Sequence, residues 1–500
     1  MNTLVPLPVV LPLLGAAITL LLGSRPWTQR TVSVGCLSGS LVVAVVLLVQ
    51  AYRQGPLVMQ IGGWPAPVGI VLVADQLAAL MLVVSSAVTL CVLLYSIGQG
   101  QAEIGETSPV AIFHPTYLVL TAGVCNAFLA GDLFNLFVGF EMLLAASFVL
   151  ITLNGTRPRI RTGSTYVVVN ILASMIFLIS VGLVYAATGT LNLAQLTARL
   201  DALPGGVRLS LQLMLLVAFG IKAAVFPLSA WLPDSYPTAP APVTAVFAGL
   251  LTKVGVYAII RTQTLLFPGQ QAGELLMVAA GLTMLVGILG AVAQSDIKRL
   301  LSFTLVSHIG YMIFGVGLST VAGLVGAIFY VVHHITIQTT LFLISGLVEQ
   351  RAGSTDLRRL GGLARLAPMV GVLFFVSAMN LAGIPPFSGF LGKLGLLQAG
   401  VAAGGPLPWT LVAVGTVTSL LTLYVASRVW NIAFWRSPCE TVAPTAPLPA
   451  LMVGATVALV ALGVALTVVA GPLFEYTGRA ATDLIERTPY VRAVLPGGAS

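Results

Sequence analysis

Residues 219–253 read FGIKAAVFPLSAWLPDSYPTAPAPVTAVFAGLLTK, and this stretch decides the architecture. It joins two apolar segments through a break that contains five prolines from Pro227 to Pro242. Proline removes an intrahelical hydrogen bond and clashes with the preceding turn, so the stretch predicts a helix that breaks about one turn after Lys222. A second lysine, Lys253, lies inside the following apolar segment. The rest of the sequence has to explain two lysines embedded in such apolar surroundings.

The composition indicates a membrane protein. Of the 500 residues, 58% are hydrophobic and 8% are charged, whereas soluble globular chains carry about 25% charged residues. This excludes a soluble enzyme, a disordered protein and a nucleic-acid-binding protein. The net charge of +8 does not indicate an acidic partner, because almost all Lys and Arg residues fall in loops. The 4 cysteines are far apart, so a disulfide scaffold and a zinc or iron–sulfur site lack ligands.

Apolar runs of about 20 residues, the length that crosses the hydrocarbon core, occur roughly fourteen times. We expect spans at 4–23, 31–51, 70–97, 110–129, 132–153, 164–189, 208–226, 239–260, 273–293, 299–318, 320–348, 365–384 with 389–402, 407–433 and 448–472. The twelfth is most simply one broken helix, and residues 191–196 predict a short surface helix. The first run has no cleavage site after it and is read as a span. The fold class is therefore an all-α polytopic membrane protein.

The loop charges predict the orientation of the chain. If both termini face outside, the outer loops hold only Arg53, Arg199, Arg208 and Arg261, apart from the tail. The inner loops then hold most of the basic residues, namely Arg25, Arg30, Arg157, Arg159, Arg161, Lys298, Arg299, Arg351, Arg358, Arg359, Arg365, Arg428 and Arg436. This asymmetry follows the positive-inside rule and places both termini outside.

Ionisable residues inside the spans are the candidate functional residues. A charged side chain at the bilayer centre costs about 2.5–3.5 kcal/mol on insertion scales, and such residues usually face the bundle interior and mark an ion path. The candidates are Glu141, Lys222, Lys253 and Lys393, with His308, His333 and His334 in apolar helices. The neighbours His333 and His334 are about 100° apart around a helix, so they do not line one path equally. Asp132 and Asp75 lie near helix starts, which favours a role as N-cap residues.

These residue types suit proton handling. Desolvation lowers the pKa of a lysine by up to several units, toward neutral pH, and a nearby carboxylate raises it again. A buried Glu–Lys pair is therefore a proton switch. A second proline break, Gly383-Ile-Pro-Pro-Phe-Ser-Gly389, stands just before Lys393. Broken helices at corresponding places in two halves indicate inverted repeats with an ion site at the membrane midplane.

These motifs resemble those of a known family, the antiporter-like proton-channel subunits shared by respiratory complex I and the Mrp multisubunit sodium/proton antiporters. The resemblance covers about residues 70–435 and rests on DLFNLFVGFE (132–141), WLPDSYPTAPAPVTAVFAGLLTK (231–253) and GIPPFSGFLGK (383–393). Within the family the chain is most similar to the D subunits of the Mrp branch. Complex I subunits usually have Ala-His where this chain has Ser235-Tyr236.

The resemblance implies fourteen helices with two inverted five-helix repeats, helices 4–8 and 9–13, and broken helices 7 and 12. The implied division is 1–109 for helices 1–3, 110–262 for the first repeat, 263–433 for the second, and 434–500 for helix 14 and the tail. It also implies that Glu141 and Lys222 form a charge pair, that Lys253 is the central relay lysine and that Lys393 is the terminal one.

One departure from the family concerns helix 11. The family usually has a lysine after the histidines, where this chain has Gln338, and glutamine carries no titratable proton. His334 lies four residues before Gln338 on the same helix face, so we expect it to supply the titratable step. His333, His308 and Asp132 remain further candidate members of the path.

The leading interpretation is a subunit of an Mrp-type antiporter in a bacterial cell membrane, and not an enzyme. It would translocate protons while the complex couples this movement to sodium export, with other antiporter subunits as partners and no cofactor. One alternative is a proton-pumping subunit of a complex I-type or membrane-hydrogenase machine. Another is a membrane scaffold with a vestigial relay, which only Gln338 supports. The sequence assigns no sodium site, because hard cations need oxygen ligands and few acidic residues are buried.

Overall fold

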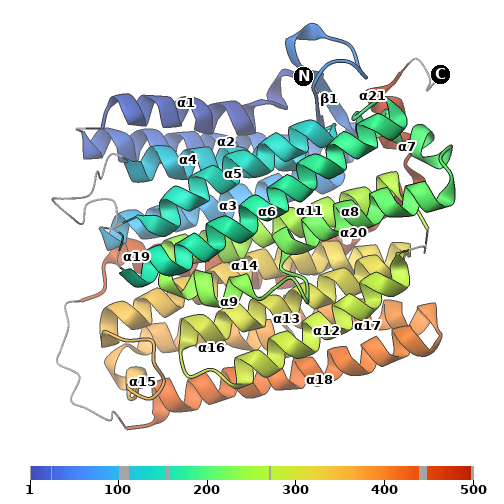
Figure 1. Cartoon of the computed structure of the whole chain (residues 1–500). Helices are drawn as coiled ribbons and strands as arrows, with labels where there is room; N and C mark the ends of the chain where they lie inside the picture. The colour runs from blue at the N-terminus through green and yellow to red at the C-terminus, as the bar shows by residue number, and fades with distance from the viewer. Residues whose placement is uncertain are drawn as a thin grey trace.

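The computed structural model describes residues 2–23, 25–100, 112–153, 155, 157–269, 272–437 and 447–496. Within them, long helices run side by side across the molecule, and both termini lie toward the same end of the bundle (Figure 1). We call this the terminal end. The opposite end is called the arginine-rich end, after Arg159, Arg299, Arg351, Arg358 and Arg436.

The first half of the chain crosses the bundle eight times. The first six traverses are α1 (Leu7–Leu21), α2 (Pro26–Gln54), α3 (Gln76–Gln99), α4 (Phe113–Leu129), α5 (Leu133–Thr152) and α6 (Arg157–Thr188). The short helix α7 (Leu193–Asp201) follows. The seventh traverse is broken into α8 (Gly205–Ala223) and α9 (Trp231–Ser235), and the eighth runs through α10 (Ala241–Val246), η5 (Phe247–Leu251), α11 (Thr252–Arg261) and η6 (Thr262–Leu266).

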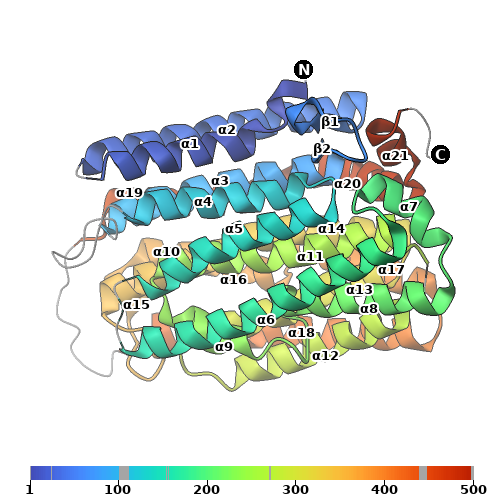
Figure 2. The same ribbon diagram turned by 45° about the horizontal axis from the view of Figure 1, so that its top comes forward.

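The second half adds six traverses. They are α12 (Gly273–Val292), α13 (Ile297–Gly317), α14 (Val321–Ala352), the broken pair α16 (Pro368–Ala382) and α17 (Ser388–Ala403), α18 (Pro406–Val429) with η7 (Trp430–Trp435), and α19 (Ala450–Val468). The remaining helices are α15 (Leu363–Leu366), α20 (Ala470–Glu486) and α21 (Thr488–Val494). In both views α1 and α2 form one edge of the bundle and α12 and α18 the other (Figures 1 and 2).

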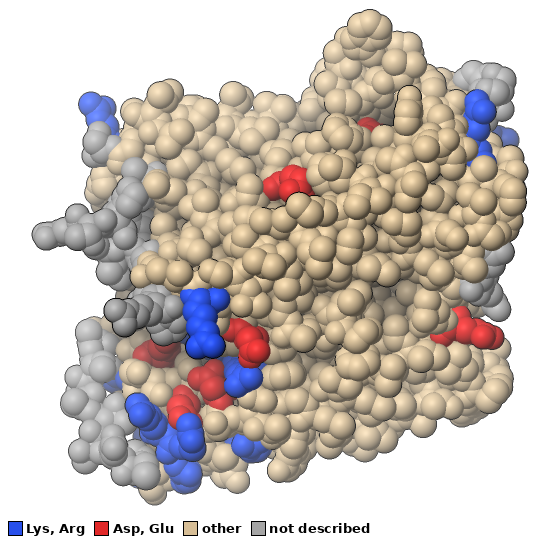
Figure 3. Space-filling view, viewed as in Figure 1, with Lys and Arg blue, Asp and Glu red and all other residues tan. Residues whose placement is uncertain are grey.

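The expected all-α polytopic fold is confirmed. Eleven helices are long and apolar enough to cross a membrane, and α1, α4 and the pair α16–α17 bring the traverses of the described chain to the expected fourteen. Charged side chains gather at the two ends of the molecule and leave a nearly uncharged band between them (Figure 3). An apolar band of this kind faces lipid favourably because hydrocarbon solvates it better than water does.

The structure differs from the sequence prediction near the terminal end. Residues Leu57–Gln60 (β1) and Val71–Ala74 (β2) form an antiparallel hairpin, so the third span starts at Gln76 and not at residue 70. The expected tail contains α20 and α21, which sequence reasoning missed. The expected repeat boundary at residue 262 falls inside the eighth traverse, and the boundary at 109–110 lies outside the described residues.

Proline and glycine explain both helix breaks. The helix α8 ends at Ala224, which adopts the left-handed conformation with φ of 58°. The helix α16 ends in the same way at Gly383, with φ of 86°. Proline follows each end within three residues, and because it cannot continue the helix the chain restarts as α9 and α17. The breaks predicted from the sequence are therefore confirmed.

Two connections in the fold match each other with a constant shift of 164 residues. At the start of α5, Leu133 N donates to Leu191 O and Leu193 N donates to Gly131 O, both at 3.0 Å. At the start of α13, Ile297 N donates to Thr355 O at 3.0 Å and Leu357 N donates to Ser295 O at 2.8 Å. The helices α6 and α14 have 32 residues each, and Val321 stands 164 residues after Arg157. The left-handed residues that end α8 and α16 also correspond, because Gly383 stands 159 residues after Ala224.

Candidate functional site

Lys222 lies in the last turn of α8, directly before the helix break, and is 4% exposed. Its Nζ donates to Asn170 O at 3.1 Å and to Ser174 Oγ at 2.9 Å, both on α6. A close approach of α11 fixes this position, because a Cβ on Gly255 would lie 2.6 Å from Ala223 N. The break thus ends α8 where its lysine faces polar atoms inside the bundle.

Glu141 lies on α5 and is partly buried. Its Oε1 is buried and has no hydrogen-bond partner. Within the described chain no hydrogen bond joins Glu141 to Lys222, although the two groups interact electrostatically. Glu141 and Lys222, which the sequence predicts as a charge pair, therefore interact electrostatically without a hydrogen bond between them. The buried Oε1 of Glu141 can still accept a hydrogen bond from another group.

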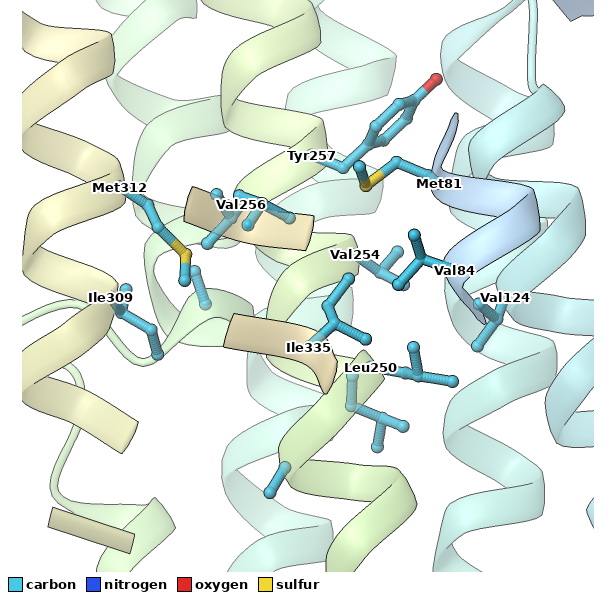
Figure 4. Close-up of a cluster of buried hydrophobic side chains, with 14 of the residues drawn as sticks. Met81, Val84, Val124, Leu250, Val254, Val256, Tyr257, Ile309, Met312 and Ile335 are labelled. Atoms are coloured by element: carbon cyan, nitrogen blue, oxygen red, sulfur yellow. The ribbon is translucent and has the colours of Figure 1, made fainter. Parts of the chain in front are cut away.

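Lys253 is completely buried at the start of α11. It follows the π-helical turn η5, and its Nζ reaches back to donate to Ala248 O at 2.6 Å. Wide π-helical turns are frequent at functional sites. The next residue along the chain, Val254, belongs to a cluster of buried apolar side chains that includes Val84, Val124 and Ile335 (Figure 4). Lys253 is thus a completely buried amine that donates to a main-chain carbonyl one turn back.

Three histidines lie on the neighbouring helices α13 and α14, all with 1% exposure or less. The rings of His334 and His308 have centroids 5.3 Å apart. His308 Nδ1 is hydrogen-bonded to Tyr330 Oη at 2.7 Å, and His308 Nε2 to Thr422 Oγ1 at 3.3 Å. Among the residues that the structure describes, neither ring nitrogen of His334 has a hydrogen-bond partner. An unpartnered buried imidazole is costly unless water satisfies it, so the surroundings of His334 suit a bound water.

His333 turns away from His334 toward the second helix break. Its Nδ1 lies 3.0 Å from Ser388 Oγ, which donates to Asn380 Oδ1 at 3.3 Å. The sequence argument that adjacent histidines face different directions is confirmed. A close approach of the main chain explains Gly389 beside this pair, because a Cβ there would collide with Asn380 O and would also lie 3.0 Å from the His333 ring.

Gln338 is completely buried one turn after His334. Its Nε2 donates to Leu301 O at 2.7 Å, while its Oε1 has no partner. The amide is therefore anchored to α13 at one end and free to accept a hydrogen bond at the other. This geometry suits a passive hydrogen-bonding link.

Lys393 lies on α17 and is 3% exposed. Its Nζ donates to Leu381 O at 3.1 Å, Ala382 O at 2.9 Å and Ser419 Oγ at 3.0 Å. The two carbonyls end α16, and a helix C-terminus carries partial negative charge that stabilises a cation. The second broken helix thus holds its lysine with the carbonyls that the break exposes.

Asp132 serves as the N-cap of α5, since its carboxylate accepts from Asn135 N at 2.6 Å. The favoured N-cap interpretation is therefore confirmed. Within the described chain no group of three His, Cys, Asp or Glu side chains is placed to hold a metal ion.

Arg261 was expected in an outer loop, and that expectation is wrong. It is 3% exposed inside the eighth traverse and binds the Asp75 carboxylate in a bidentate ion pair of 2.5 and 2.8 Å. Tyr257 accepts a hydrogen bond from Arg261 at 3.0 Å, and the Tyr490 ring lies 5.3 Å from the guanidinium. Asp75 also caps α3 by accepting from Ala78 N. The pair ties α3, α11 and the C-terminal α21 together at the terminal end.

We expect Asp75→Asn to destabilise the protein strongly, because removing one partner of a buried ion pair costs about 3–5 kcal/mol. The measurement is the thermal unfolding of the purified complex. Asp201→Asn is the matched control, since Asp201 is 42% exposed in its ion pairs with Arg208 and Arg487, and exposed pairs contribute about 0.2–1 kcal/mol. Equal melting temperatures for the two variants would contradict a stabilising role for the buried pair.

The structure brings His334, His308 and His333 together on α13 and α14, while Lys222 lies against α6 and Lys393 against α18. Sequence reasoning missed the polar partners that hold these side chains. Asn170 and Ser174 are four residues apart and share a helix face. This spacing of two polar residues in an apolar helix is the feature of the sequence that could have indicated a polar partner for Lys222. Tyr330 and Thr422 gave no comparable signal, because an isolated Tyr or Thr in an apolar helix is common.

Known proteins share this architecture. Residues 130–422 match the family described as NADH:quinone oxidoreductase/Mrp antiporter, transmembrane. The chain is 40% identical to the D subunit of the Na(+)/H(+) antiporter of Alkalihalophilus pseudofirmus, over 99% of this chain and 100% of the relative. It is 36% identical to the D subunit of the Na(+)/H(+) antiporter of Bacillus subtilis over the same shares.

Two solved structures are similar as well. A chain of the Mrp complex from Dietzia sp. superposes with a TM-score of 0.91 at 34% identity and covers 99% of both chains. A chain of respiratory complex I from Thermus thermophilus with bound NADH gives a TM-score of 0.83 at 25% identity, over 97% of this chain and 99% of the other.

Proposed function

The chain belongs to the NADH:quinone oxidoreductase/Mrp antiporter transmembrane family, and on that premise we propose that it is a proton-translocating subunit of a multisubunit sodium/proton antiporter. It is a transporter subunit and not an enzyme. The single observation that carries the proposal is the set of buried basic side chains, Lys222, Lys253, His334 and Lys393, within a bundle whose buried side chains are mostly apolar. Burying such groups is costly, and proteins retain them inside membranes mainly along ion paths.

The proposed relay runs across the bundle from Glu141 and Lys222 to Lys393. Lys253 and His334 interact electrostatically, as do His308 and Lys393. Between these groups stand polar atoms that lack protein partners, namely both ring nitrogens of His334, Nε2 of His333 and Oε1 of Gln338. Water bound at these atoms would complete a hydrogen-bonded chain, since a buried water commonly makes about three hydrogen bonds to such groups.

We expect His334→Ala to lower sodium-driven proton transport about a hundredfold, the range typical of a lost proton-transfer group. His333→Ala is the matched control and should lower it by less than about tenfold, because His333 faces Ser388 and lies off the face shared by His334 and Gln338. Gln338→Lys should be tolerated, since an ammonium can donate to the same Leu301 carbonyl. Acidification or alkalinisation of everted vesicles after a sodium pulse measures all three.

Equal losses from the two histidine variants would remove the argument from helix faces. Full activity in His334→Ala would show that protons bypass α14, and water alone would then have to connect Lys253 with Lys393.

The proposed organisation is a pair of inverted repeats, α4 to η6 and α12 to η7, flanked by α1–α3 and by α19–α21. The matched hydrogen bonds at the starts of α5 and α13, and the matched breaks after α8 and α16, support this division. We further propose that the arginine-rich end faces the cytoplasm and both termini face outside, because basic residues concentrate on the inner side of membranes. The partners of this chain are the other subunits of the antiporter. We assign the sodium site to the assembled complex and not to particular residues of this chain.

Purification of the native complex tests the proposal. We expect the chain to copurify with further antiporter subunits. We also expect the complex to move protons in response to sodium in reconstituted liposomes, and this movement to be lost when this subunit is omitted. The alternative is a proton-pumping subunit of a complex I-type machine, to which the chain is less similar. Copurification with quinone-reductase subunits and proton movement driven by NADH, with no response to sodium, would replace the proposal by that alternative.

A further inference from the structure

A small apolar cavity lies in the second half of the bundle, between α13, α14, α16 and α18. Leu301, Thr304, Leu341, Ala378, Leu381 and Thr422 are among the residues that line it. About 20 Å³ is open to the centre of a water molecule, which is room for about one water. Ile297, in the first turn of α13, also lines it, so the cavity lies on the side of the bundle that is toward the arginine-rich end.

The inner end of the cavity touches the candidate relay at two points. Thr422 lines the cavity, and its Oγ1 lies 3.3 Å from His308 Nε2. Leu301 also lines it, and its carbonyl accepts the amide of Gln338 at 2.7 Å. A water that occupied the cavity would therefore stand next to the hydrogen-bonding shell of His308.

The matching place in the first half of the bundle is filled. With the shifts of 164 and 159 residues established above, the positions of Leu301, Thr304, Leu341 and Ala378 correspond to Phe137, Phe140, Phe177 and Phe219. These four phenylalanines pack on one another, with ring centroids 4.8 Å apart for Phe177 and Phe219 and 5.7 to 6.1 Å apart for the other pairs in contact. This phenylalanine plug lies between the start of α5 at the terminal end and Lys222.

At these four equivalent positions the first half carries the larger side chain each time, and most of the difference comes from Thr304 and Ala378, whereas at one further lining position the second half is larger, with Phe374 against Leu215. Close packing of aromatic rings leaves no room for water, because protein interiors are packed as densely as organic crystals. Smaller side chains at the same positions leave the cavity beside His308. An apolar cavity of this size is dry at rest, and apolar constrictions in membrane proteins gate ions by wetting and drying.

We propose that the cavity is a hydrophobic gate that admits water, and with it protons, between the arginine-rich end and His308. The phenylalanine plug keeps the equivalent route from the terminal end to Lys222 closed. Access in this subunit is thus one-sided because the first half carries phenylalanine at the four positions where the second half has Leu301, Thr304, Leu341 and Ala378. The inference rests on the proposed function only where it makes His308 the acceptor of the proton.

Access is tested by cysteine labelling in the assembled complex. In a background without Cys36, Cys91, Cys125 and Cys439, Ala378→Cys is exposed to silver ion, which reacts with thiols and is close to water in size. Everted vesicles present the arginine-rich end, by the orientation proposed above. The matched control is Ala218→Cys, a fully buried alanine beside Phe219 in the packed half. We expect modification of Ala378→Cys to be at least about tenfold faster, because the close-packed interior excludes ions.

A filled cavity tests the role of the gate. Ala378→Phe introduces the residue that the first half carries at this place, and we expect sodium-driven proton transport to fall at least about tenfold because no water then fits. Ala378→Ser keeps the space and should stay active. If Ala378→Phe fails to assemble, Ala378→Leu fills most of the same volume and replaces it.

Equal and slow labelling of Ala378→Cys and Ala218→Cys would overturn the access route. Rapid labelling together with full transport in an assembled Ala378→Phe complex would overturn its role in proton movement. Failure of the proposed relay has a different signature, since transport would then survive in Lys253→Ala while the labelling pattern stayed the same.

Discussion

We expect Lys253→Ala to abolish sodium-driven proton transport while the complex still assembles, and Lys253→Arg to impair it nearly as much. Lys253 is completely buried, and its Nζ has a single hydrogen bond, to Ala248 O. Alanine removes the proton carrier from this point of the relay. Arginine keeps the positive charge, but a guanidinium does not release its proton at physiological pH. A relay group must bind a proton and also release it, so a positive charge alone does not restore proton transport.

The measurement is proton movement in everted vesicles after a sodium pulse, with the amount of assembled complex determined in parallel. Lys298→Arg is the matched control, because Lys298 lies at the arginine-rich end and forms an ion pair of 2.5 Å with Glu349 that arginine can also make. This control should transport like the unmodified complex. Normal transport in Lys253→Arg would show that Lys253 acts as a fixed positive charge and not as a proton carrier.

Much of the fold follows from local features of the sequence. Each traverse corresponds to an apolar run, and both helix breaks occur where proline follows a lysine or precedes one. The hairpin 57–74 was missed because its second strand, Val71–Ala74, is as apolar as the helix that follows it. The helix α20 was missed because Glu475, Arg479 and Asp483 interrupt its apolar residues, so it does not read as a span.

The site was predictable in its ionisable residues and not in their contacts. A lysine in an apolar run is visible as an anomaly, because the cost of burial has to be balanced. Which neighbour receives its hydrogen bond depends on the rotation of helices that are distant in sequence, as Lys222 and Asn170 are. Arg261 shows the same limit. It stands where a loop was expected, and only the approach of Asp75 from α3 explains why it remains inside.

The asymmetry between the halves was hidden for another reason. The matching positions Phe219 and Ala378 share no chemistry, so no motif connects them. Their equivalence appears only through backbone hydrogen bonds and helix ends, which depend on main-chain geometry and tolerate changes of side chain.

Glu141 and Lys222 are expected to behave as one functional unit although no hydrogen bond joins them. Lys222→Ala removes a proton carrier and leaves Ser174 Oγ and Asn170 O without their donor. Glu141→Gln keeps the shape of the side chain and removes only its charge, so the electrostatic attraction that holds the proton on Lys222 is lost. We expect either change to reduce the transport rate about a hundredfold, which leaves a measurable residue, and the double variant to be no worse than either single one. Effects of residues that act as a unit are not additive.

Ser174→Ala is the control that separates positioning from proton transfer. It removes one of two acceptors of Lys222 and leaves both charges in place, so transport should fall by no more than about tenfold, the equivalent of about 1.4 kcal/mol, which is the upper range for a single hydrogen bond. Additive losses in Glu141→Gln and Lys222→Ala would mean that the two residues contribute separately. The carboxylate, whose Oε1 has no partner in the described chain, would then serve another group. Coupled losses would place the switch between α5 and α8, where Lys222 stands in the last turn before the helix break.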